Sequence, residues 1–426
     1  MTPLARFFKK NLQIILLILI CLTTYFIVFF KIGGFNFLEQ KLFYSQDSKE
    51  YLEVARWMGG EDIPLNPYRP FFYPLLIFIF YGGFGVIGLW GLQVLLFTVG
   101  QILLFKGVKK LSGNFSVAMI AFVICQSAIS LVVYTNLALT ETTVFFLLAC
   151  LCFTLTNLIQ EKKPVSLSYT TVFVAGILAV TKPVFYFIWL VFFALGFLKI
   201  LGKRKMALQV ILILVLVSTP VLIQKSIQYV NHGTIGNNPI GELTLKNYLF
   251  KRVFHSANFG HVRSFQDLNN KELQALSSIT EGIPYDRALN FLKVHWKTTL
   301  EIFWLNYKEN LRSANPYIDP AENPTLVQAT YKLNSFLAWF HLALPLLLFL
   351  TLTDYFFTKS STLIILVFSG GVLFYFLLTS GISFWAGDRL IIPSIALSAF
   401  FYPVFIHYFY FRIKNLFNRL KIRNTH

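Results

Sequence analysis

Apolar runs about as long as a membrane is thick recur through most of this chain. A helix of about 20 apolar residues crosses the hydrocarbon core of a bilayer, and such runs follow one another from residue 12 to residue 411. Only 13% of the 426 residues are charged and 56% are hydrophobic, whereas a water-soluble domain carries about 25% charged residues. The sequence therefore predicts an all-α polytopic membrane protein and excludes a water-soluble enzyme, a disordered chain and a fibrous one.

Ten segments have the composition of membrane-crossing helices, although three of them are shorter than ideal. They are residues 12–30, 88–105, 115–133, 142–159, 167–180, 184–200, 206–223, 336–357, 362–379 and 390–411. The chain has no internal repeat, so the inverted repeat that marks many transporters is missing. These segments divide the chain into an N-terminal transmembrane module (1–223), an external helical domain (224–335), and C-terminal transmembrane helices with a basic cytoplasmic tail (336–426).

The segment Phe71–Phe84 is also apolar, and the charge distribution decides how it is placed. With ten crossings and a cytoplasmic N-terminus, the cytoplasmic segments carry a net charge of +16 and the external segments +2. An eleventh crossing would move Lys106, Lys109 and Lys110 outside. Because Lys and Arg favour cytoplasmic loops, we predict a juxtamembrane or re-entrant helix at 71–84 and two cytoplasmic termini. The same rule accounts for the overall charge of +18, so no nucleic-acid partner is predicted.

Two predicted external segments are long, and we call them the first outer loop (31–87) and the second outer loop (224–335). The second outer loop contains a predicted amphipathic helix, 285–310. Its apolar stripe consists of Leu289, Leu292, Trp296, Leu300 and Phe303. Because such a stripe needs a partner surface, we expect it to cover the first outer loop and to bound an outward-facing cavity.

Two acids in external positions are candidates for chemistry. Asp47 lies in a predicted interfacial helix, where the spacing Asp47-x-x-Glu50 also fits a capping box with Asp47 as the N-cap. Glu141 begins the fourth crossing, where it is either a first-turn acid favoured by the helix dipole or a functional acid at bilayer depth. If the two acids share a site, we expect them within about 15 Å of each other.

Three cations are predicted on the same face of the membrane. Arg69 lies in the proline-rich segment Asn66–Pro74, Lys182 separates the fifth and sixth crossings, and Arg389 follows Asp388 before the last crossing. Each could serve as an interface anchor. Together with the acids, they suit transfer of a group from a lipid phosphate, because a carboxylate can take the proton of an acceptor hydroxyl while cations stabilise the leaving phosphate.

This ordered set of motifs resembles the integral-membrane glycosyltransferases of the C class (GT-C), in the branch of the dolichyl-phosphate-mannose protein mannosyltransferases and aminoarabinose transferases. The matching residues are Asp47, Tyr51 and Ala55. The matching motifs are R-P-F-F-Y-P-L-L at 69–76, L-T-E-T at 139–142, G-I-L-A-V-T-K-P at 176–183 and R-L-I-I-P at 389–393. The chain departs from the branch in having Asp47-Ser48 in place of two adjacent acids, Lys at 182 in place of Arg, and no soluble C-terminal domain.

The resemblance implies an enzyme of the bacterial plasma (inner) membrane with its active site outside. It implies inverting transfer of a hexose or pentose from a polyprenyl-phosphate-linked donor to a lipid, glycan or protein acceptor. Asp47 and Glu141 would be catalytic, Arg69, Lys182 and Arg389 would bind the donor phosphate, and Tyr51, Tyr68, Tyr73 and Asp388 would line the acceptor cavity. Its partners are then the donor and membrane lipids, while the sugar and the acceptor stay open.

No cofactor is required by this interpretation, although a divalent metal, which some relatives use, stays possible. His255 and His261 lie six residues apart with no acid between them, so we predict a surface pair and not a set of metal ligands. Two alternatives of other kinds are a transporter or flippase and a polymerase of lipid-linked saccharides. The transporter would need charges within the crossings or repeat symmetry, and the sequence shows neither.

Overall fold

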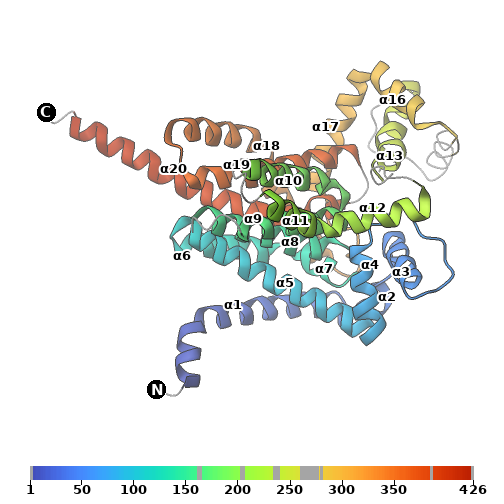
Figure 1. The fold of residues 1–426 in the computed structure, drawn as a ribbon, viewed down its shortest axis with the longest axis horizontal. Coiled ribbons are helices and arrows are strands. Elements are labelled where there is room, and N and C mark those ends of the chain that lie inside the picture. The colour runs from blue at the N-terminus through green and yellow to red at the C-terminus, as the bar shows by residue number, and fades with distance from the viewer. Residues whose placement is uncertain are drawn as a thin grey trace.

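The computed structural model describes residues 3–160, 166–201, 207–233, 240–259, 278, 282–383 and 387–423. Within these ranges the secondary structure is entirely helical. Figure 1 shows a bundle of long helices from which a smaller group of helices, α13, α16 and α17, projects at one end. The predicted fold class, an all-α polytopic membrane protein, is confirmed.

Each predicted crossing corresponds to one helix or to one bent pair of helices. They are α1 (Pro3–Lys31), α5 (Gly82–Ser112), α6 with α7 (Phe115–Ser127, Ile129–Thr135), α8 (Glu141–Gln160), α9 (Ser166–Thr181), α10 (Tyr186–Leu201), α11 with α12 (Ala207–Val217, Thr219–His232), α18 (Pro324–Thr358), α19 (Ser361–Thr379) and α20 (Ile395–Arg423). Six described helices are long and apolar enough to cross a membrane, or up to eight if each bent pair is one span. The predicted ten also counts α9 and α10, whose apolar described parts fall among helices of 10–17 residues.

The two bent pairs have local causes. The bend of 59° between α6 and α7 lies at Ala128, whose φ of −77° and ψ of 70° leave the helical region. The bend of 64° between α11 and α12 is followed by Pro220 in the first turn of α12. Proline has no N–H to donate to the preceding turn, so a helix begins there more readily than it continues.

The segment 72–84 is a short helical arm that folds back on α5. It comprises α4 (Phe72–Leu76), a π-helical turn η1 (Ile77–Tyr81) and the first residues of α5. Gly85 breaks the helix with φ 62° and ψ −154°, and a Cβ on Gly88 would lie 2.3 Å from the carbonyl oxygen of Phe80. Residues eight apart in a straight helix are separated by about 12 Å along its axis. The chain therefore reverses at Gly85, and 72–112 is not one straight 41-residue crossing.

The second outer loop has a small core of its own. Its helices are α13 (Ile240–Thr244), η4 (Leu245–Phe250), α14 (Lys251–Phe259), α16 (Tyr285–Val294) and α17 (Trp296–Arg312). They bury the apolar residues Leu249, Phe250, Val253, Ala288, Leu292 and Ile302 against one another. This cluster is separate from the core of the bundle.

The predicted helix 285–310 breaks at His295, where φ is −96° and ψ is 39°. The break shifts the helical phase, so the predicted apolar stripe is wrong in its middle: Trp296 and Leu300 are 56% and 58% exposed. In α17 the buried side chains are instead Ile302, Asn306, Tyr307, Asn310 and Leu311. The predicted stripe is therefore not one continuous buried face.

Two asparagines of α17 fasten the second outer loop to the end of α19. The amide of Asn306 donates to the carbonyl oxygen of Gly381 over 3.0 Å. The amide of Asn310 donates to the carbonyl oxygens of Ser380 and Ser383, each over 2.8 Å. These bonds hold the backbone that leads into the segment carrying Arg389.

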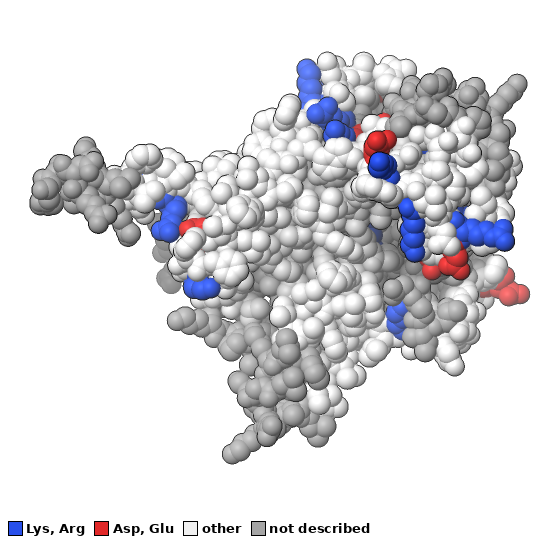
Figure 2. All heavy atoms as spheres, turned by 90° about the horizontal axis from the view of Figure 1, so that it is seen from above, with Lys and Arg blue, Asp and Glu red and all other residues white. Residues whose placement is uncertain are grey.

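The described ends of the chain lie on one side of the bundle. In Figure 1, the beginning of α1 and the end of α20 are on the left, and α3 (Gln46–Met58), α13 and α16 are on the right. On the face drawn in Figure 2, the described Lys, Arg, Asp and Glu side chains gather toward these two ends, with an uncharged zone between them. An apolar belt between two charged ends is what a membrane-spanning bundle requires.

Candidate functional site

Helix α3 presents two acids on one face. Its N-cap is Ser45, whose Oγ accepts a hydrogen bond from the N–H of Ser48 over 3.0 Å. Asp47 is therefore in the first turn and is not the cap, contrary to the capping-box alternative. Asp47 and Glu50 are three residues apart, which places their side chains on the same side of a helix.

Arg69 links these two acids. Its Nε donates to Glu50 Oε2 over 2.7 Å, and its Nη2 pairs with Asp47 Oδ1. The guanidinium also lies 5.0 Å from the ring centroid of Tyr51, which favours a fixed cation. Arg69 follows a turn in which Asn66 Oδ1 accepts the N–H of Tyr68 over 2.9 Å, so the proline-rich segment presents the guanidinium on a rigid backbone.

Arg389 continues the chain of charges from the far end of the sequence. It lies on the short helix η7 (Gly387–Leu390), and its Nε donates to Glu141 Oε1 over 2.8 Å while its Nη1 pairs with Asp47. Lys182 Nζ lies 3.6 Å from the same Glu141 oxygen. Asp47 and Glu141 thus contact one guanidinium, well within the expected separation. The six side chains form one alternating series, Glu50–Arg69–Asp47–Arg389–Glu141–Lys182.

The two candidate acids have different access to solvent. The Asp47 side chain is 27% exposed and that of Glu141 is 0% exposed. Burial alone would raise the pKa of the Asp47 carboxyl, but the guanidinium groups of Arg389 and Arg69 outweigh it and hold the pKa below its usual value. Asp47 is therefore ionised at neutral pH and within reach of a ligand, whereas Glu141 serves as a buried counter-ion for Arg389 and Lys182.

Asp388 lies behind the site. Its carboxylate accepts the hydroxyl of Tyr134 over 2.9 Å and the amide of Asn334 over 3.2 Å. Burial raises the pKa of this carboxyl to about 6, although these two hydrogen bonds oppose the rise. Asp388 was expected to line the acceptor cavity; the structure places it between α7 and α18, where it fixes η7.

The three tyrosines of the expected cavity lining are placed differently from one another. Tyr51 and Tyr73 are 5% and 1% exposed and pack edge to face, with centroids 5.2 Å apart. The Tyr73 hydroxyl donates to Gln93 Oε1 over 3.4 Å. The ring of Tyr51 lies under the guanidinium of Arg69, and Tyr68 is half-buried in the turn before Arg69.

Sequence reasoning missed three residues at this site. Glu50 was considered only as a capping partner, although its spacing from Asp47 indicated a shared face. Tyr248, on η4, is close enough for the charges of Asp47 and Arg389 to act on it, and the hydroxyl of Tyr317 is hydrogen-bonded to Ser45. No local pattern marks the two tyrosines, because they reach the site through the placement of the second outer loop.

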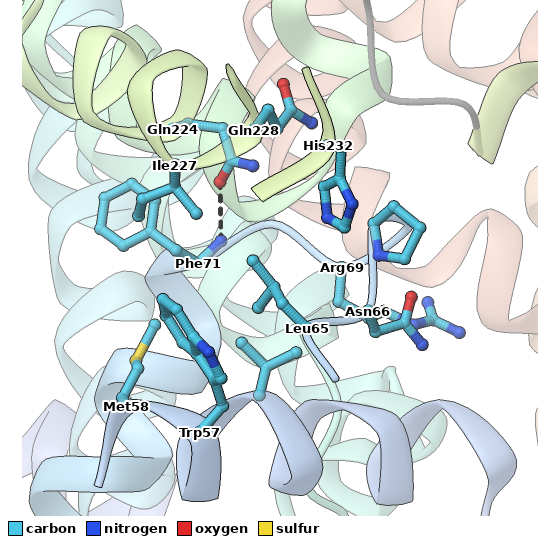
Figure 3. A pocket seen from close by; sticks show the side chains of 12 residues that line it. Trp57, Met58, Leu65, Asn66, Arg69, Phe71, Gln224, Ile227, Gln228 and His232 are labelled. Atoms are coloured by element: carbon cyan, nitrogen blue, oxygen red, sulfur yellow. Dashed lines mark hydrogen bonds between the residues drawn. The ribbon is translucent and has the colours of Figure 1, made fainter. Parts of the chain in front are cut away.

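A small pocket adjoins Arg69 on the side of α12 (Figure 3). Gln224 Oε1 accepts the N–H of Phe71 over 2.8 Å and ties α12 to the proline-rich segment. The pocket has a volume of about 10 Å³, about enough for one water molecule. Its other lining includes Trp57, Met58, Leu65, Ile227, Gln228 and His232.

Among the described residues, no three His, Cys, Asp or Glu side chains lie together as metal ligands would. His255 is on α14, and His261 lies outside the described residues. The acids of the site are instead paired with two arginines and a lysine.

The comparisons with known proteins give a similarity of fold. No protein-family model matches the chain, and no curated protein matches it. The chain is similar to the crystal structure of ArnT from Cupriavidus metallidurans bound to undecaprenyl phosphate, with 12% identity and a TM-score of 0.41 over 93% of this chain and 77% of that one. The apo structure of the same protein gives 11% identity and a TM-score of 0.36 over 94% and 78%. ArnT is an aminoarabinose transferase, from the branch that the motifs resemble. At these values the function has to be argued from the site itself.

Proposed function

We propose that this protein is a GT-C glycosyltransferase that moves a sugar from a polyprenyl-phosphate-linked donor to an acceptor hydroxyl, on the external face of a bacterial inner membrane. The observation that carries the proposal is the single guanidinium of Arg389 between Asp47 and Glu141, in line with Arg69 and Lys182 at one end of a membrane-spanning bundle. The ordered motifs of the sequence support the same donor class.

The cations suit a lipid phosphate. A guanidinium has five N–H donors, and the ion pairs described here use two nitrogen atoms each on Arg69 and Arg389. Further donors on each remain for a phosphate, and arginine binds phosphate with charge-assisted, often bidentate hydrogen bonds. Because three acids balance three cations in the series, the singly charged phosphodiester of the donor would enter a site whose cations are already oriented. The second negative charge develops on the phosphate only as the sugar leaves it.

Asp47 is the general base of the proposed reaction. In the proposed reaction the acceptor oxygen attacks the anomeric carbon from the face opposite the phosphate, and its proton passes to Asp47. The bond from that carbon to the phosphate oxygen breaks, and the lipid phosphate leaves with the electron pair. Arg389, Arg69 and Lys182 stabilise the charge that develops on it.

Donor binding would also tune the base. Arg69 and Arg389 hold the pKa of Asp47 low, and a carboxylate with a low pKa is a weak base. A phosphate that draws these guanidinium groups toward itself weakens their hold, so the pKa of Asp47 moves back toward its usual value. Asp47 would then accept a proton most readily when the sugar donor is bound, which is when the reaction requires a base.

Release of polyprenyl phosphate from synthetic polyprenyl-phosphate hexoses and pentoses tests the proposal on purified protein. We expect release with wild type on at least one donor, and a loss of about a hundredfold in Arg389→Gln. Arg56→Gln is the matched control, because Arg56 is half-exposed on α3 and pairs with Glu61 outside the series. Equal rates in Arg389→Gln and wild type would contradict the proposal, and movement of intact donor between leaflets without release would favour a flippase.

A further inference from the structure

A second cavity lies at the opposite end of the molecule from the charged series. It is formed by the end of α5, the start of α19 and the part of α20 around residues 404–415, toward the C-terminus on the left of Figure 1. Its volume is about 350 Å³, against about 10 Å³ for the pocket beside Arg69. It is thus far larger than the pocket beside Arg69 and has room for a headgroup with its glycerol.

The walls of this cavity are of two kinds. Leu111, Val404 and Phe411 give it an apolar side, and Thr362, His407 and Arg412 are among the groups that can hydrogen-bond there. Such a division matches an amphiphile whose acyl chains follow the helices and whose polar part faces the aqueous side.

Arg412 is held in place at this cavity. Its Nε and Nη2 both lie 3.3 Å from Asp354 Oδ1, and the hydroxyl of Tyr408 donates to Asp354 Oδ2 over 2.9 Å. Asp354 thus orients the guanidinium, whose side chain remains 48% exposed. A guanidinium that is fixed but accessible can add hydrogen bonds to an anion.

The surroundings of the cavity are positive. Lys109 and Lys110 end α5, Lys359 ends α18, and Lys414 follows Arg412 on α20. Asp354 carries a negative charge here, and Arg412 already neutralises it. A zwitterionic headgroup would bring its own ammonium into this field, whereas an anionic one would bring only attraction.

We propose that this cavity binds one anionic glycerophospholipid of the leaflet on that side. Its phosphodiester contacts Arg412, with His407 and Thr362 bonding to the phosphate or glycerol oxygens. Its acyl chains lie along Phe411, Val404 and the neighbouring lipid. The site is distinct from the proposed donor site, since the two are at opposite ends of the bundle.

Binding is measured on the full chain, purified in detergent and stripped of lipid, by titration with short-chain phosphatidylglycerol, short-chain phosphatidylcholine or inorganic phosphate. The readouts are thermal stabilisation and the number of lipids retained in native mass spectrometry. We expect one phosphatidylglycerol per chain, bound at least about tenfold more tightly than phosphatidylcholine, and no stabilisation by inorganic phosphate at the same concentration.

Two variants of one helix separate the site from general attraction. Arg412→Gln should weaken phosphatidylglycerol about tenfold or more, as loss of a charged hydrogen bond does. Lys414→Gln removes the same charge from α20 at an exposed position outside the lining, and it should weaken binding less than about threefold. Thr362→Leu fills the cavity without touching the Asp354–Arg412 pair and should also weaken binding, so it serves if Arg412→Gln does not fold.

Any one of four results would overturn the proposal. One is equal affinity for the two lipids, and another is equal loss in Arg412→Gln and Lys414→Gln, because either would mean diffuse attraction to the membrane. The third is unchanged binding in Thr362→Leu, and the fourth is stabilisation by inorganic phosphate alone, because a lipid must occupy the cavity itself.

Discussion

Replacement of Asp47 by asparagine is the sharpest test of the site, because it removes proton acceptance and leaves the shape. We expect Asp47→Asn to lower the rate of sugar transfer about a hundredfold or more, the usual contribution of a general base. At about 1.36 kcal/mol per factor of ten, this adds about 2.7 kcal/mol to the barrier. Glu53→Gln should be nearly silent, since Glu53 is an exposed acid on the same helix and lies outside the charged series.

The structure also predicts that the variant folds. Arg69 keeps Glu50 at 2.7 Å and Arg389 keeps Glu141 at 2.8 Å when the charge of Asp47 is lost. The lost interactions are two charged hydrogen bonds, each worth about 1.5–3 kcal/mol when well shielded. Because Asp47 is 27% exposed, solvent reduces that loss, and we expect about 1–3 kcal/mol in total.

The comparison with Asp47→Ala then distinguishes the roles. Ser45 caps α3, so alanine and asparagine should lose activity alike, and neither should unravel the helix. Transfer is measured on protein of matched monodispersity and thermal midpoint. Full activity in the asparagine variant would remove Asp47 from the mechanism and make Glu141 the candidate base. Activity in asparagine but not alanine would indicate a capping or packing role.

Three further expectations concern the frame around the site. Burial raises the pKa of the Asp388 carboxyl from 3.8 to about 6, so ionising it in the folded protein costs about 3 kcal/mol. The stability that the protonated carboxyl contributes is present at pH 4 and is lost as the pH rises through 6. The thermal midpoint of Asp388→Asn should therefore rise relative to that of wild type from pH 4 to pH 7, and two midpoint curves that stay parallel would contradict the burial. Gly88→Ala should destabilise the protein by about 1–3 kcal/mol, because the new Cβ would lie 2.3 Å from the Phe80 backbone. Gly91→Ala on the same helix is the control, since a Cβ there meets nothing within 4 Å. Equal thermal midpoints of the two variants would mean that the reversal at Gly85 is absent. A membrane-impermeant maleimide should label Trp296→Cys on intact cells and Lys414→Cys only after permeabilisation, and the reverse pattern would invert the proposed topology.

Much of the bundle could be predicted because membrane helices satisfy their backbone within one segment. Each apolar run of the required length has to become a helix in a bilayer, whatever its neighbours do. The same local logic fails where a helix is short or interrupted. Gly85 and Ala128 leave helical geometry inside apolar stretches, and no periodicity marks either position. The break at His295 likewise turned a predicted stripe of one helix into two unrelated faces.

Which residues meet at the site could be predicted in part. Charges are rare in this chain, so Arg69, Glu141, Lys182 and Arg389 stood out in otherwise apolar or proline-rich external segments, whereas Asp47 lies in a segment rich in charges. Which of these charges form ion pairs could not be predicted from the sequence, because Arg389 and Glu141, for example, are 248 residues apart. Sidedness narrowed the choice to one face of the membrane, and packing of the helices made the contacts. Tyr248 and Tyr317 gave no signal, since tyrosine is common in external loops of such proteins.

The adjacent residues Asp388 and Arg389 show how the parts depend on one another. Asp388 is buried against Tyr134 and Asn334, while Arg389 points the opposite way, to Glu141 and Asp47. One residue therefore anchors the segment to α7 and α18, and the next carries the charge that joins α3 to α8.

The second outer loop contributes to this anchoring through two side chains that bind backbone atoms. Asn306 and Asn310 bind backbone carbonyls of residues 380–383, just before Arg389. Every residue has a backbone carbonyl, so nothing in the sequence of residues 380–383 predicts this contact. Two asparagines and one acid thus hold the backbone on both sides of the segment that carries Arg389. We infer that the long outer loop serves the site chiefly by holding that arginine in line with Asp47 and Glu141.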